Sequence, residues 1–249
     1  MKFIFRLEKE PKELVYFRKR YSEWREIYPE AKIQGKNKNK TTKDRDEKAG
    51  KQLKSSLIRM QNKRCAYCEI LLKDEKDAII EHFMPRVITR DCAKKLKNDF
   101  EWKNLFISCS NGSSCGTLKA DKLPKDVFKP DDLYPQKVEE CFGCNPEGEV
   151  FALSGLDEES ERRANKTIEF FGLNCPSLVN KRKRALMLMK SKFHRERSIM
   201  SNDEQKCAEL SASYVKDLQG FDSSCEFWQT KLALLRDYKC NDVIENLLD

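Results

Sequence analysis

The sequence predicts an α+β protein in which a small strand–loop–strand–helix unit is embedded in a mainly helical chain. Two short, β-branched apolar runs, 78–80 and 105–107, are typical of strands. Pairs of cysteines stand before the first run and after the second. Long stretches toward both ends repeat apolar residues at spacings of three and four, which indicates amphipathic helices. A length of 249 residues allows one or two domains with a sizeable core.

The first region, residues 1–48, is predicted to hold a weak strand, a helix and a linker. The helix begins at Pro11 and ends at Pro29. Its apolar face carries Leu14, Phe17, Tyr21, Trp24 and Tyr28, an aromatic stripe that we interpret as core or partner interface. Residues 35–48 are polar and rich in lysine, so we expect a linker that is either an arm on nucleic acid or a solvated loop.

The second region, residues 49–155, contains the cysteine pairs. A helix with Leu53, Leu57 and Met60 on its inner face leads into a Cys-x-x-Cys turn. Four thiolates at tetrahedral geometry make a closed structural zinc site. The ligands that we expect are Cys65, Cys68, Cys109 and Cys115. Cys141 and Cys144 form a rival second pair with tighter spacing, and both lie in a predicted β-hairpin over 138–151.

The first strand ends at Glu81-His82, and the chain has only two histidines. A histidine titrates near neutral pH and can act as a general base, while a carboxylate is a hard ligand for Mg²⁺ or Mn²⁺. A Glu-His dipeptide without other motifs is more often a surface histidine beside a solvated carboxylate. The flanking cysteines and the Trp-x-Asn-Leu motif that begins at Trp102 favour the catalytic interpretation here.

These motifs resemble the HNH (ββα-metal) endonuclease family. They are Cys65-x-x-Cys68, Glu81-His82-Phe83-x-Pro85, Trp102-x-Asn104-Leu105 and Cys109…Cys115-x-x-x-Lys119. More narrowly, they resemble the PtuB-type HNH nucleases of Septu and retron anti-phage defence systems. A helical tail with matching residues between Ala164 and Arg182 extends the likeness to most of residues 50–190.

The resemblance implies a role for each residue of the pattern. His82 would be the general base, Glu81 would hold a catalytic Mg²⁺ or Mn²⁺, and Asn104 would orient the loop that carries the histidine. The family's usual Asn or His ligand after the last zinc cysteine is replaced by Gly116. We therefore expect Asn111 to supply a substitute ligand, and Gly116→Asn to be tolerated or to raise activity.

The resemblance also implies partners: a PtuA-like ATPase and, in retron systems, a reverse transcriptase with its RNA–DNA product. The net charge of +8 fits a nucleic-acid partner. We expect Arg86, Arg90 and Lys119 to contact its backbone. Two alternatives stay open, a non-catalytic zinc module that binds nucleic acid or a partner, and the same catalysis on structured RNA such as tRNA.

The third region, residues 156–249, is predicted to be almost entirely helical. Asp157 would cap its first helix, Gly172 would end it, and Pro176 would open the next. We expect this region and the aromatic N-terminal helix to dock a partner. The odd number of cysteines, eleven, and the lack of a signal peptide or membrane-length apolar run predict a cytoplasmic protein with free thiols and no membrane contact.

Overall fold

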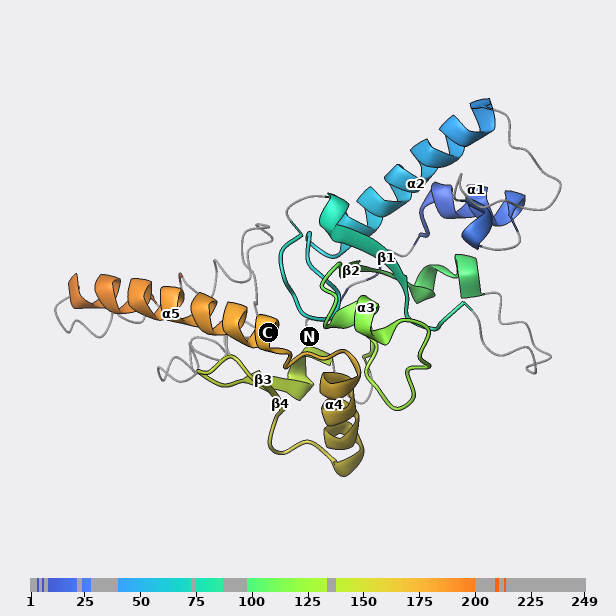
Figure 1. Cartoon of the computed structure of the whole chain (residues 1–249). Helices are drawn as coiled ribbons and strands as arrows, with labels where there is room; N and C mark the ends of the chain where they lie inside the picture. Colours follow the sequence, from blue (N-terminus) through green and yellow to red (C-terminus); the bar gives the residue numbers. More distant parts are fainter. Residues whose placement is uncertain are drawn as a thin grey trace.

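The structure is a computed structural model that describes residues 4, 6, 9–21, 24–27, 40–72, 75–86, 98–133, 138–199, 209–210 and 213. It is a mixture of helices and two small sheets, as the α+β prediction requires. Strands β1 (Ala78–His82) and β2 (Leu105–Cys109) form an antiparallel pair at the centre of the molecule (Figure 1). Every residue of β2 is buried. Helix α3 (Cys115–Lys119) follows β2 after a short loop, so the predicted strand–loop–strand–helix order is present.

The long helix α2 (Lys40–Met60) packs against β2 through Leu53 and Leu57, which are fully buried. Gln61, just after the helix, bonds to both backbone groups of Ile107 in β2. Its Nε2 donates to the Ile107 carbonyl at 2.9 Å, and its Oε1 accepts from the Ile107 N–H at 2.7 Å. These two hydrogen bonds give partners to the Ile107 N–H and carbonyl, on the edge of β2 that has no neighbouring strand. They fix the helix against the sheet.

The N-terminal region differs from its prediction in two ways. Helix α1 (Lys12–Arg20) ends before Tyr21, and a 3-10 turn, η1 (Trp24–Ile27), follows, so the predicted helix to Pro29 is too long. Residues 40–48, predicted as linker, are the first turns of α2. The buried Asp46 explains their order, because its carboxylate accepts hydrogen bonds from the hydroxyls of Tyr16 and Tyr21.

The second sheet is the predicted hairpin, formed by β3 (Phe142–Cys144) and β4 (Val150–Ala152) after the turn η5 (Val138–Cys141). Helix α4 (Glu158–Phe170) begins at Asp157, whose Oδ1 accepts from the Ser160 N–H at 2.9 Å. Helix α5 (Pro176–Ile199) projects away from the centre of the molecule (Figure 1). Short 3-10 turns η2 (Glu75–Asp77), η3 (Asn98–Phe100) and η4 (Trp102–Asn104) flank the strands.

One hydrophobic core joins segments from all three predicted regions. Phe171, at the end of α4, stacks on Tyr67 of the Cys-x-x-Cys turn with ring centroids 4.0 Å apart and planes 17° apart. From the N-terminal side, Phe17 is fully buried and Trp24 nearly so. The proposed boundary at 48 falls inside α2. The boundary at 155 separates segments that share this core.

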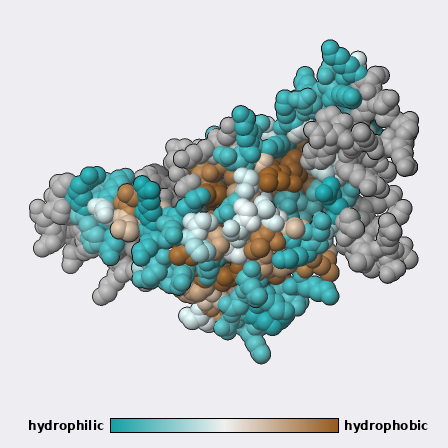
Figure 2. Space-filling model, in the orientation of Figure 1, coloured by the Kyte–Doolittle hydropathy of each residue, from teal (hydrophilic) through white to brown (hydrophobic). Residues whose placement is uncertain are grey.

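The surface of the described part is mostly polar. Hydrophilic side chains cover α2 and α4 and much of α5, with hydrophobic patches over the middle of the molecule (Figure 2). Within the described residues, no helix combines the length and the apolarity that a membrane crossing needs.

Candidate metal centre and hydrolytic site

The structure brings together the four cysteines that the sequence predicts as metal ligands. Within the described part of the chain, the ligand atoms of Cys65, Cys68, Cys109 and Cys115 all lie within 4.8 Å of one another, and all four residues are buried. The sulfurs of Cys68 and Cys109 are 3.8 Å apart. A tetrahedral zinc ion with Zn–S bonds of about 2.3 Å places its sulfurs about 3.8 Å apart. The cluster can therefore hold a metal ion such as zinc with little adjustment.

Backbone geometry places each pair of thiols. After Cys68, Glu69 has a positive φ of 64°, and its N–H donates to the Cys65 carbonyl at 3.1 Å, which closes the first turn. Cys109 ends β2 and Cys115 begins α3. The Cys115 N–H donates to the Phe171 carbonyl at 2.8 Å, so the segment after α4 holds the second turn.

The four thiols cannot all ionise beside one another without a cation. Burial opposes ionisation of Cys65, yet hydrogen bonds from the other thiols lower its pKa well below the ordinary value. The pKa of Cys68 and that of Cys115 are raised, first through hydrogen bonds with Cys109. A divalent ion would remove this conflict, because thiolates are its ligands. The rival pair is elsewhere: Cys141 is buried at the end of η5 and Cys144 lies in β3.

His82 ends β1, and its ring contacts Asp99 and Trp24. Its Nε2 lies 2.9 Å from the Asp99 carbonyl oxygen, and its ring meets Trp24 edge to face at 4.8 Å. A carbonyl only accepts, so Nε2 carries the proton, and Nδ1 of the neutral ring keeps its lone pair. Burial, together with the charges of Arg86 and Lys119, lowers the pKa of His82 to about 4, although the bond to Asp99 opposes this. At neutral pH the ring is uncharged and Nδ1 can accept a proton.

Asn104 fastens the loop that follows His82. Its Oδ1 accepts from the Met84 N–H at 2.7 Å, and its Nδ2 donates to the Met84 carbonyl at 3.0 Å. The Asn104 carbonyl accepts from the Phe83 N–H at 2.9 Å. A buried amide that pairs both groups of one residue holds that loop in a single position.

Glu81 precedes His82 and is enclosed on both sides. Its Oε1 accepts from the Lys119 ammonium at 2.7 Å. A Cβ on Gly116 would lie 2.8 Å from Oε2, too close for any side chain without a shift. Burial raises the pKa of Glu81, and Lys119 opposes the rise. The Mg²⁺ or Mn²⁺ that the resemblance implies does not fit this arrangement, because the Lys119 ammonium already lies at Oε1 and Gly116 offers no side-chain ligand.

The remaining predicted residues have different surroundings. Lys119, which was expected to contact a nucleic-acid backbone, is buried with its ammonium bonded to Glu81. Asn111 Nδ2 donates to Ser177 Oγ at 3.1 Å, and its Oδ1 accepts from the Ser113 N–H at 3.3 Å, so both groups of its amide have partners other than Glu81. Arg86 is exposed and close enough to Glu81 and His82 to affect their ionisation. Arg90 lies outside the described residues.

The sequence did not indicate two supporting residues, Asp99 and Phe171, or the contact between Trp24 and His82. The aromatic stripe contained Trp24 but gave no sign that it would meet His82. Asp99 contacts His82 through its backbone carbonyl, and the identity of a residue does not indicate such a backbone contact. Its carboxylate also accepts from the Trp24 N–H at 2.7 Å. Phe171 is one apolar residue among many at a helix end.

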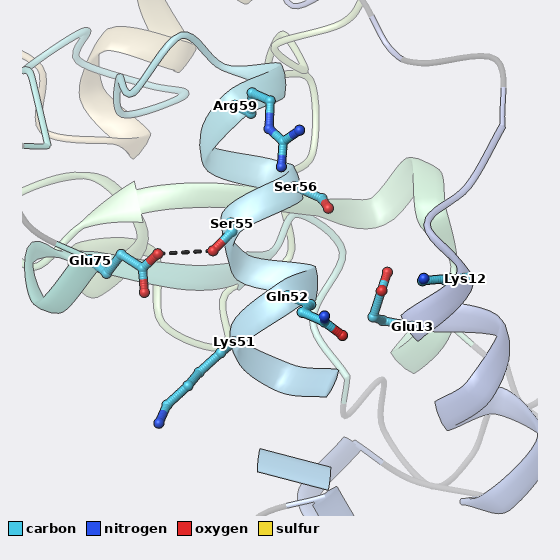
Figure 3. A pocket seen from close by; sticks show the side chains of 8 residues that line it. All are labelled: Lys12, Glu13, Lys51, Gln52, Ser55, Ser56, Arg59 and Glu75. Atoms are coloured by element: carbon cyan, nitrogen blue, oxygen red, sulfur yellow. Dashed lines mark hydrogen bonds between the residues drawn. The ribbon is translucent and has the colours of Figure 1, made fainter. Parts of the chain in front are cut away.

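A separate hollow lies between α1 and α2 (Figure 3). It has a volume of about 320 Å³, and its lining includes Lys12, Glu13, Gln52 and Arg59. Ser55 and Glu75 also line it, and Ser55 donates to Glu75 at 2.8 Å, the bond drawn in Figure 3. The lining contains none of the predicted site residues.

Comparison with known proteins adds no family to this description. No protein-family model matches the sequence, and no curated protein matches it. The functional argument therefore depends on the residues themselves and on their geometry.

Proposed function

We propose that the chain is a zinc-stabilised, HNH-type endonuclease that hydrolyses phosphodiester bonds. The observation that carries the proposal is the state of His82. Its Nε2–H is bonded to the Asp99 carbonyl, so the neutral ring offers Nδ1 as a base. This histidine ends a strand beside a four-cysteine cluster, in the strand–loop–strand–helix order that the HNH resemblance implies.

The chemistry needs a base for water and a cation near the phosphate. Nδ1 of His82 takes a proton from a water molecule as its oxygen attacks phosphorus. The bond from phosphorus to the leaving oxygen breaks, and the proton returns to that oxygen through solvent. Asn104 holds the loop after His82, so the ring keeps its orientation during the step.

Arg86 is the residue that best fits the phosphate. It is exposed, lies four residues beyond His82, and its charge reaches both His82 and Glu81. A guanidinium binds two phosphate oxygens through parallel hydrogen bonds. The net charge of +8 adds a general attraction to nucleic acid.

The wider setting that we propose follows the resemblance to PtuB-type nucleases. The chain would act on DNA, or on structured RNA such as tRNA, within an anti-phage defence complex. A PtuA-like ATPase would be its partner, with a retron reverse transcriptase and its RNA–DNA in retron versions. The sequence has no Gly-rich phosphate-binding motif, so any nucleotide dependence would come from such a partner.

Cleavage of DNA and RNA pools by the purified protein, alone and with its partner, tests the proposal. We expect His82→Ala to reduce the cleavage rate by about 10²–10⁴-fold, the usual contribution of a general base. His194→Ala is the matched control, because the other histidine is exposed on α5. Equal rates for wild type and His82→Ala would refute the assignment.

The second candidate function is a zinc module that binds nucleic acid without cutting it. The ion pair between Glu81 and Lys119 favours it, since the carboxylate has no evident catalytic duty there. This function would be supported if the wild-type protein binds nucleic acid tightly and does not cleave it, either alone or with its partner.

A further inference from the structure

The Lys119 ammonium lies at the centre of the hydrolytic site and has all its hydrogen bonds satisfied. Nζ donates to Glu81 Oε1 at 2.7 Å, to the His82 carbonyl at 2.8 Å and to the Ala120 carbonyl at 3.1 Å. An ammonium has three N–H donors, and each has an acceptor. The Lys119 side chain is 1% exposed and that of Glu81 is 14% exposed. The two side chains therefore form an internal ion pair and not a surface contact.

The surroundings of Glu81 are shaped for this pair. Gly116 brings its Cα against the second carboxylate oxygen, where a Cβ would lie 2.8 Å from Oε2. The Gly116 N–H is already used, donating to Ser108 Oγ at 3.0 Å. One oxygen of Glu81 therefore faces the ammonium, and the other lies against Gly116.

We infer that the Lys119 ammonium takes the place of a catalytic divalent cation, and that the site binds no Mg²⁺ or Mn²⁺ at Glu81. A Mg²⁺ ion needs oxygen ligands at about 2.0–2.1 Å in octahedral geometry. A Mg²⁺ ion at Oε1 would compete with the ammonium for that oxygen, and a displaced ammonium would be a buried charge without its partner. Removing one partner of a buried ion pair is strongly unfavourable, because the other charge remains uncompensated.

Lys119 is a positioning residue in this arrangement. It does not touch the phosphate, since it is buried, but it joins the Glu81 carboxylate to the backbone of His82. The pair is neutral overall and leaves Arg86 as the cation for the substrate. The consequence for catalysis rests on the proposed function. In that case nucleic acid would be cleaved without added divalent ions, provided that the cysteine-bound metal is kept.

Manganese binding tests the inference without any substrate. Zinc-loaded, full-length protein would be titrated with Mn²⁺ and free Mn²⁺ followed by electron paramagnetic resonance. We expect wild type and Glu81→Gln to bind Mn²⁺ equally weakly. Lys119→Met removes the ammonium but keeps the length of the side chain, so we expect it to gain one Mn²⁺ site, at least tenfold tighter than any in wild type. Lys122→Met, an exposed lysine three residues later, is the matched control and should gain none.

Two outcomes would overturn the inference. One is a Mn²⁺ site in wild type that Glu81→Gln abolishes, a comparison that does not require Lys119→Met to fold. The other is a folded, zinc-containing Lys119→Met protein that gains no Mn²⁺ site. Failure of the proposed function is distinguishable, because a protein that cuts no nucleic acid can still show the expected Mn²⁺ behaviour.

Discussion

Phe171 links the end of α4 to the cysteine cluster, and its removal should destabilise the whole fold. The ring is fully buried and stacks on Tyr67 at 4.0 Å, with Phe83 at 6.4 Å. Phe-to-Ala changes in cores cost about 3–5 kcal/mol through lost burial and the cavity left behind. For a chain of this size, roughly 2–4 °C of melting temperature is lost per kcal/mol, so we expect a fall on the order of 10 °C.

Urea unfolding followed by tryptophan fluorescence measures this loss directly. Met187→Ala is the control, because Met187 on α5 is 60% exposed and its truncation should change stability by less than about 0.5 kcal/mol. Phe171→Ala should also release zinc at lower urea, since the Cys115 N–H is bonded to the Phe171 carbonyl. A loss below about 1 kcal/mol, with zinc release unchanged, would show that residues after 156 are a separate unit and that our description of one core is wrong.

Four further results are expected. Elemental analysis should find one zinc per chain, lost in Cys68→Ser and kept in Cys144→Ser; the reverse pattern would contradict the cluster. Asn104→Ala should cost about 1–3 kcal/mol by chemical denaturation, because both backbone groups of one buried turn lose their partner. Gly116→Ala should cost about 1–3 kcal/mol through overpacking, whereas Gly112→Ala, with open space around it, should not; equal stabilities would refute the steric argument. His82, with a pKa near 4 when folded and 6.5 when unfolded, stabilises the protein fully above pH 6.5. This contribution, about 3 kcal/mol, is lost as pH falls toward 4, so the stability difference from His82→Gln should shrink over that range; a constant difference would argue against burial as the cause.

Features set by local chemistry could be predicted from the sequence. The runs around Ile80 and Ile107 form the expected strands, and Asp157 caps α4. The four-cysteine cluster was also predictable, since two closely spaced pairs around one hairpin leave few ways to meet. The choice against Cys141 and Cys144 was confirmed by the clustering of the other pair.

Features set by distant partners could not be predicted. A lysine is exposed by default, and only the meeting of α3 with β1 buries Lys119 against Glu81. Residues 40–48 have no apolar pattern, yet they are helical because two tyrosines bond to Asp46. In both cases a polar residue gains its partner only after the chain has folded, so the sequence pattern carries no sign of it.

The charged groups around Glu81 are divided between the interior and the surface of the protein. A phosphodiester is repelled by an open carboxylate, so the nuclease function that we propose needs a cation to offset that charge. Here the Lys119 ammonium neutralises Glu81 inside the protein, while the exposed Arg86 stays positive at the surface. His82 follows Glu81 in the chain, is buried, and is uncharged at neutral pH. In the function that we propose, the substrate would meet Arg86 as the cation and His82 as a neutral base, while the Glu81–Lys119 pair adds no net charge. The absence of a side chain at Gly116 leaves room for the carboxylate of that pair.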